Sequence, residues 1–190
     1  MCPLHTASEA AAQAAARATA RAATQAAARA ATQAAPLVAA QAAAHTLAEQ
    51  VRDAMLAGDH ASKMLGMQVV GIGPGRAVVT MAVRQDMLNG HAICHGGLMA
   101  TLADSAFALA CNSYNELTVA SGFSIDLLAP GRLGDVLTAT CAERSKAGRT
   151  GLYDTEVHNQ RGECIALFRG RSHTARGRPV VQAATATPQA

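Results

Sequence analysis

The stretch of sequence that decides the fold runs from Asn89 to Asn112 and reads NGHAICHGGLMATLADSAFALACN. Its first part is polar and rich in glycine, which is typical of a tight turn. From Leu98 onward it lacks glycine and proline and is rich in alanine and leucine, so we expect a helix of about four turns. Apolar side chains surround this predicted helix on nearly all sides, which indicates that it is buried in the domain core.

One carboxylate, Asp104, interrupts the apolar helix. A buried charge costs free energy unless it is paired or used. The glycines Gly96 and Gly97 lie where the helix should begin, and the free N–H groups of a helix N-terminus suit an oxygen that becomes negative during a reaction. Asp104 is the eighth residue after Gly96, which is roughly 12 Å along a helix. One chain can hardly place both groups on one carbonyl, so the spacing favours a two-fold dimer with composite sites.

Short segments with alternating polarity surround this stretch and predict strands. Glycine-containing turns separate several of them, as at Gly73-Pro-Gly and Lys146-Ala-Gly. The fold class is therefore predicted to be α+β, a curled antiparallel sheet of about six strands wrapped around one long helix, because a doubly wound parallel sheet would need more helices. The predicted strands are 69–72, 77–83, 118–128, 136–144, 150–159 and 164–173.

The composition divides the chain into three parts. Residues 1–35 are alanine-rich and of low complexity, and we expect a frayed helix or a disordered, dispensable extension, although the segment also mimics an organelle transit peptide. Residues 36–175 form the predicted domain, which begins with an amphipathic helix ending near Gly58. Residues 176–190 are predicted to be a disordered tail.

Charge and cysteine content narrow the class of protein. The net charge of +3 is mild and does not by itself imply a nucleic-acid partner. No apolar run reaches the length of a membrane span. The chain has five cysteines, an odd number, and no two of them form a CxxC motif. This pattern favours reduced thiols in a cytoplasm over a framework of disulfides.

Several motifs together resemble the hotdog-fold acyl-CoA thioesterases, and among them the phenylacetic acid degradation (PaaI) type. The likeness covers roughly residues 45–175. Its motifs are Asn89-Gly-His, Cys94-His-Gly-Gly, Leu102-Ala-Asp-Ser-Ala-Phe-Ala, Ser124-Ile-Asp-Leu-Leu-Ala-Pro-Gly, Gly134-Asp, Gly148-Arg-Thr-Gly-Leu-Tyr-Asp and Leu167-Phe-Arg-Gly-Arg-Ser-His.

The resemblance implies an enzyme that hydrolyses phenylacetyl-CoA-like or hydroxyphenylacetyl-CoA-like thioesters to free acid and CoA in bacterial aromatic catabolism. It implies a cytoplasmic homotetramer built as a dimer of dimers. Coenzyme A is part of the substrate, and no metal or redox cofactor is expected. Two other hypotheses stay open at this point: a non-catalytic acyl-CoA sensor and a hotdog dehydratase acting on hydroxyacyl thioesters.

The resemblance also assigns roles to single residues. Asp104 would be the catalytic acid, as nucleophile or as general base for water. The backbone N–H of Gly96 would hold the oxyanion, and Asn89 and His95 would orient the thioester or lend a second donor. Ser124 would position the water.

Two other chemistries at the same stretch are less favoured. His91, Cys94 and His95 could suggest a metal site, but their spacing is crowded and no second Cys/His pair follows. A thiol nucleophile at Cys94 beside His95 is disfavoured because adjacent residues rarely form a dyad.

Basic residues and glycines in the second half of the chain are candidates for coenzyme A binding, because the ligand carries several phosphate charges. Arg169 and Arg171 are two apart on a predicted strand and so share a face. The full predicted set is Gly97, Lys146, Gly148, Arg149, Arg169 and Arg171.

Overall fold

A computed structural model describes residues 4–182, which fall into two units divided between residues 43 and 44. The first unit is helical over its described residues, because helix α1 begins at Leu4 and continues into the second unit, where it ends at Gly58. A helix is one of the two states predicted for the alanine-rich extension, and the end of α1 agrees with the predicted end near Gly58. The predicted boundary at residues 35 and 36 lies within α1.

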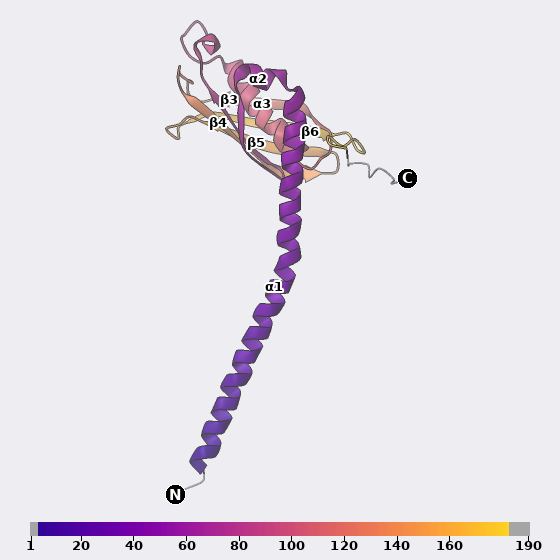
Figure 1. Ribbon diagram of the computed structural model, residues 1–190. Helices are drawn as coiled ribbons and strands as arrows, with labels where there is room; N and C mark the ends of the chain where they lie inside the picture. Colours follow the sequence, from indigo (N-terminus) through magenta and orange to yellow (C-terminus); the bar gives the residue numbers. More distant parts are fainter. Residues whose placement is uncertain (1–3, 183–190) are drawn as a thin grey trace, which may run out of the picture. The chain divides into compact units, whose positions relative to one another are not determined.

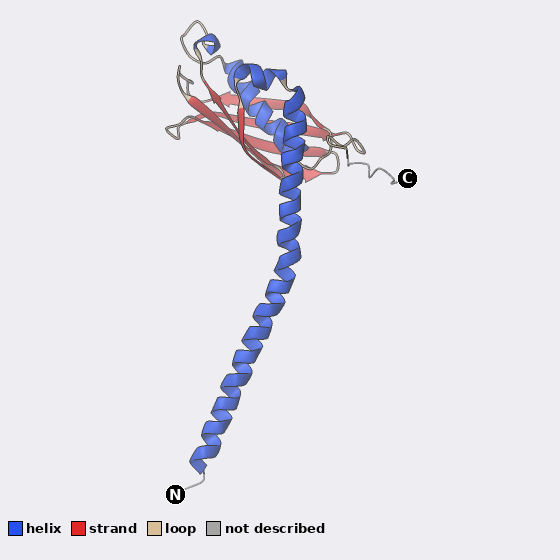
Figure 2. Cartoon of the chain, viewed as in Figure 1, coloured by secondary structure: helices blue, strands red, loops and turns tan. Residues whose placement is uncertain are grey.

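The second unit consists of a six-stranded antiparallel sheet and α-helices (Figures 1 and 2). The strand order is β1-β2-β4-β5-β6-β3, so β1 and β3 form the two edges. The six strands match the predicted segments to within a few residues, and the predicted α+β hotdog architecture is confirmed. Their bounds are β1 Gln68–Gly73, β2 Arg76–Ala82, β3 Thr118–Leu127, β4 Val136–Ala147, β5 Thr150–His158 and β6 Cys164–Thr174.

Helix α3, Gly96–Asn112, lies against one face of this sheet (Figure 1). Leu102, Ala103 and Ala106 are fully buried, and Phe107 packs edge-to-face on Tyr153 with the ring centroids 5.4 Å apart. This confirms the prediction that the helix is buried on most sides. The helix thereby fixes Gly96 at one end of the core and Asp104 in its middle.

A short helix, α2 at His60–Leu65, is missing from the sequence-based prediction. Asp59 caps its start by accepting a hydrogen bond from the Ser62 N–H at 2.9 Å. Gly66 ends it in the left-handed conformation, with φ of 69°. The cap signals are present in the sequence, but the apolar pattern between them is too short to predict a helix.

The chain continues in an ordered course after β6. Leu117 donates a backbone hydrogen bond to the Arg178 carbonyl at 2.7 Å, and the Asn115 side chain bonds the backbone of Val181. Residues 176–182 of the predicted disordered tail are therefore held by the domain, and residues 183–190 of that tail lie outside the described residues.

No helix in the described part of the chain combines the length and the hydropathy of a membrane span.

Candidate active site

The N-terminus of α3 carries the residues predicted to hold an oxyanion. His95 caps the helix, and its Nδ1 accepts a hydrogen bond from the Gly97 N–H at 3.1 Å. The Gly97 donor is thus occupied, whereas the Gly96 N–H meets no acceptor within residues 4–182. A free N–H at the first turn of a helix is a ready donor for developing negative charge.

Asn89 lies beside Gly96 in a cavity of about 380 Å³. The Asn89 Oδ1 accepts from the backbone N–H groups of His91 and Ile93 at 2.9 and 3.4 Å, which closes the turn before the helix. Its Nδ2 has no partner in the described part of the chain, so it can donate to a ligand. His95 lines a different cavity, so its observed role is that of a helix cap.

Gly96 has a structural reason to be glycine. A Cβ at this residue would lie 2.6 Å from Cδ1 of Leu127, which is closer than real Cβ contacts. Leu127 ends β3 and also lines the cavity of Asn89 and Gly96. The absence of a side chain lets Leu127 pack against the helix start and keeps the N–H accessible.

Asp104 lies in a separate cavity of about 270 Å³. Its carboxylate is half-buried. None of the described residues donates a hydrogen bond to it or forms an ion pair with it. Burial raises the pKa of this carboxyl above its ordinary value. An unpaired carboxylate held in an apolar wall is the arrangement expected of a group that acts on a ligand. The wall is formed by Met55, Phe107, Ala108, Asn112, Leu117, Thr118, Val119, Ala120 and Val180.

Gly96 and Asp104 therefore open into different cavities of one chain. Ser124 is also separate from Asp104, because it pairs in register with Arg169 and lines a cavity with Asp126 and Asp154. The single chain brings Asn89 together with Gly96, but it does not bring either of them to Asp104 or Ser124.

The loop between β3 and β4 fixes the start of α3. The Cys94 N–H donates to the Gly131 carbonyl at 2.8 Å, and a Cβ at Gly131 would lie 3.2 Å from Cβ of Cys94. This close contact joins the loop to the residue that precedes the helix cap. The loop also supplies part of the wall of the Gly96 cavity, through Leu128, Ala129 and Pro130.

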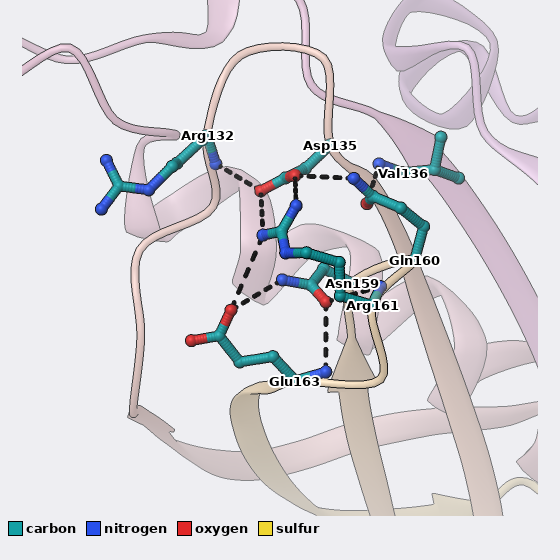
Figure 3. Close-up of polar contacts among 7 residues, drawn as sticks. All are labelled: Arg132, Asp135, Val136, Asn159, Gln160, Arg161 and Glu163. Atoms are coloured by element: carbon teal, nitrogen blue, oxygen red, sulfur yellow. Dashed lines mark hydrogen bonds and ion pairs between the residues drawn. The ribbon is translucent and has the colours of Figure 1, made fainter.

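Asp135 holds the end of this loop through the polar cluster in Figure 3. Its buried carboxylate accepts from the Arg132 N–H at 2.9 Å, from Gln160 Nε2 at 2.9 Å and from Arg161 Nη1 at 2.8 Å. The hydrogen bonds from the Arg161 guanidinium and from Arg132 lower the pKa of Asp135 to about 2. Gly134-Asp is one of the motifs of the resemblance, but the sequence alone predicts no role for Asp135. The turn between β5 and β6 completes the cluster with Asn159 and Glu163.

The basic residues predicted to bind coenzyme A are in different electrostatic environments. Arg169 donates to Asp154 at 2.6 and 2.9 Å, and Lys146 bonds Glu116 at 3.0 Å. Arg171 and Arg149 form no ion pair among the described residues, although Arg149 Nε donates to the Thr174 carbonyl at 3.1 Å. Arg169 and Arg171 are both exposed on one face of β6, as the spacing predicts.

Gly148 lies in the turn between β4 and β5 with φ of 61°. Arg149 lies in the same turn, at the end of the β4–β5 strand pair. The left-handed backbone at Gly148 explains the glycine without a ligand. A role in binding phosphate stays a prediction.

Other chemistries at the α3 start find little support in the geometry. Burial raises the pKa of the Cys94 thiol, which disfavours a thiolate nucleophile. The Nδ1 of His95 already accepts a hydrogen bond from the Gly97 N–H, so this atom is not free to act as a base or as a metal ligand. Within residues 4–182, no group of three or more His, Cys, Asp and Glu side chains is arranged to hold a metal ion.

Comparison with known proteins decides the family. The profile described as the thioesterase superfamily matches residues 91–166. Acyl-coenzyme A thioesterase PaaI of Escherichia coli is 49% identical over 130 residues, which are 68% of this chain and 93% of that protein. The chain belongs to the PaaI-type hotdog thioesterases. Neither the sensor nor the dehydratase hypothesis is favoured by these relatives.

Solved structures place this thioesterase in the same fold. The E. coli PaaI protein from the phenylacetic acid degradation operon superimposes with a TM-score of 0.69 at 48% identity, covering 70% of this thioesterase and 97% of that chain. A Streptococcus mutans protein bound to acetyl CoA superimposes with a TM-score of 0.57 at 28% identity. The match covers 59% of this thioesterase and 90% of that chain.

Proposed function

We propose that this thioesterase hydrolyses CoA thioesters of phenylacetyl-like and hydroxyphenylacetyl-like acids to free acid and CoA, in bacterial aromatic catabolism. The observation that carries the proposal is the Asp104 carboxylate, which is half-buried in an apolar cavity with no partner among the described residues. The 49% identity to E. coli PaaI supports the substrate class. The free cysteines Cys94, Cys111, Cys141 and Cys164 support a cytoplasmic setting.

The reaction adds an oxygen nucleophile to the thioester carbonyl. Either Asp104 attacks the carbonyl carbon directly, or it takes a proton from a water molecule that attacks. The carbonyl oxygen becomes negative and accepts from the Gly96 N–H, with Asn89 Nδ2 as a second donor. Collapse of the tetrahedral intermediate breaks the C–S bond, and the CoA thiolate leaves and is protonated. If Asp104 is the nucleophile, water then hydrolyses the acyl–enzyme anhydride. His95 fixes the helix start, and Ser124 is proposed to orient the water.

The complete site is proposed to form between two chains, with Asp104 of one chain facing the helix N-terminus of its partner. Two observations support it. Gly96 and Asp104 open into different cavities of one chain. In addition, β3 is an edge strand on which both faces are largely exposed, including Val119, Phe123 and Leu127. Exposed apolar edges of this kind are normally covered. A dimer of such dimers would give the homotetramer that the resemblance implies.

Coenzyme A is proposed to bind by its phosphates at the exposed basic residues. Arg171 and Arg149 are favoured over Arg169, because a phosphate at Arg169 would compete with the carboxylate of Asp154. Lys146 and Gly148 stay candidates as side-chain and backbone donors, and Gly97 stays a candidate only for close approach of the ligand, because its N–H is bonded to His95.

The proposal is tested by measuring free-thiol release from a panel of acyl-CoAs with the wild type, Asp104→Asn and Asp104→Ala. We expect kcat to fall by about 10²-fold or more, because removal of a general base or nucleophile typically costs that much. Asp53→Asn changes an exposed carboxylate on α1 and should leave turnover unchanged. Unchanged turnover in both Asp104 variants removes that residue from the mechanism. Tight acyl-CoA binding without thiol release by the wild type would instead identify a sensor.

A further inference from the structure

The segment that follows β6 is anchored beside the Asp104 cavity. The Asn115 Nδ2 donates to the Val181 carbonyl at 3.0 Å, and the Val181 N–H donates to Asn115 Oδ1 at 2.7 Å. One side-chain amide thus pairs with both backbone groups of one residue, as a neighbouring strand would. Leu117 adds backbone bonds to Arg178 and Ala175 at 2.7 and 2.8 Å. Four hydrogen bonds therefore hold residues 175–181 against the loop between α3 and β3.

The backbone conformation and position of Asn115 suit it to hold this segment. Its φ of 59° places it in the left-handed region, which few residues other than glycine and asparagine adopt. Its backbone N–H donates to the Asn112 carbonyl at 2.9 Å, which fixes it just after the end of α3. The anchor is therefore rigidly connected to the helix that carries Asp104.

The anchored segment places Val180 in the wall of the Asp104 cavity. The side chains of Met55, Phe107, Leu117 and Val119 make the rest of that wall largely apolar. Two polar side chains also line it, but both are engaged. Asn112 bonds the Ala108 carbonyl and both backbone groups of Thr118, and the Thr118 hydroxyl bonds Glu116 and Thr174. Apart from Asp104, the wall offers a ligand apolar surface.

We propose that Val180, held in place by Asn115, is a specificity-determining residue that limits the size of the acyl group. The inference rests on the proposed function, because an acyl group bonded to the carbonyl attacked at Asp104 must occupy space next to that carboxylate. The preferred acyl group is compact and has an apolar body. A longer acyl chain would have to displace Val180 and so break the bonds to Asn115.

The test compares kcat/KM for phenylacetyl-CoA and decanoyl-CoA in the wild type, Val180→Ala and Asn115→Gly. Glycine keeps the left-handed backbone at residue 115 and removes only the amide that holds Val181. We expect both variants to raise the decanoyl-to-phenylacetyl ratio by about 10-fold, since a small change of volume in an apolar pocket is worth that much. The double variant should gain little over either single variant, because both remove the same wall.

Val70→Ala is the matched control, because it makes the same change at an exposed residue of β1 and should leave the ratio at its wild-type value. A ratio within twofold of the wild type in both Val180→Ala and Asn115→Gly, with folding confirmed by thermal unfolding, overturns the inference while the thioesterase function stands. A wild type that cleaves no thioester overturns the proposed function and this inference with it.

Discussion

At the scale of single residues, the charge of Asp104 destabilises the folded protein, and the same carboxylate is proposed to act on the thioester. Burial raises its pKa in the folded chain above that in the unfolded chain. A carboxyl shifted in this direction lowers the free energy of unfolding at pH values above its folded pKa, where it is ionised in both states. Below its unfolded pKa it is protonated in both states, and the cost disappears. The residue proposed to carry the reaction therefore reduces stability at neutral pH.

Asp104→Asn should consequently be more stable than the wild type while it is less active. We expect the Tm at pH 7 to rise on the order of 2 °C, because the amide removes the uncompensated charge and keeps the shape. The gain should shrink as the pH falls toward 4. Thermal unfolding of both proteins at several pH values measures it. A lower Tm for the variant at pH 7 would show that Asp104 is paired in the assembled protein.

At the scale of the elements, Asp135 joins the β3–β4 loop to the β5–β6 turn (Figure 3). Its pKa of about 2 lies below the ordinary carboxyl value. A carboxyl shifted in this direction contributes stability above its unfolded pKa and loses it as the pH falls toward its folded pKa. The loop that the cluster holds also bonds Cys94 just before the helix cap, so the cluster indirectly supports the helix start at Gly96, the proposed oxyanion donor.

Asp135→Asn should therefore lower the free energy of unfolding by roughly 2 kcal/mol at pH 7, since two hydrogen bonds from the Arg161 guanidinium lose their charged acceptor. Urea unfolding at pH 7 and pH 3 measures this cost, which should be smaller at pH 3. The exposed Asp53→Asn variant should show little cost at either pH. An equal cost for Asp135→Asn at both pH values would contradict a charge-based role for the cluster.

Elements with strong local patterns could be predicted, and contacts between distant residues could not. The alternation in residues 150–159 predicts β5, and the glycine pair before an apolar run predicts the start of α3. The carboxylate of Asp104 and the donor at Gly96 are recognisable because their types are unusual in their surroundings. The pairing of Arg169 with Asp154 and the approach of Val180 to Asp104 depend on strand register and chain path, which the local sequence does not encode.

At the scale of the whole molecule, the proposed composite site makes a prediction about mixed assemblies. Asp104→Asn and Gly96→Pro should each be nearly inactive alone, the latter because proline is tolerated at the first residue of a helix but lacks the N–H that is proposed to hold the oxyanion. If each site takes Asp104 from one chain and Gly96 from the other, half of randomly mixed dimers carry one intact site of two. Co-expression of the two variants in equal amounts should thus restore about one quarter of wild-type turnover.

Thiol release by the co-expressed protein gives the answer, with each variant expressed alone as the baseline. A site contained in one chain would leave every mixed dimer with a defect in both sites. Turnover of the mixture no higher than that of the single variants would therefore refute the composite site.

The contact between Gly96 and Leu127 also has a consequence for protein engineering. Because the leucine methyl group already fills the volume in which a side chain at residue 96 would start, any side chain there requires the Leu127 side chain to move. Substitutions at residues 96 and 127 are therefore expected to depend on each other. A library meant to remodel this end of the cavity has to randomise both codons together.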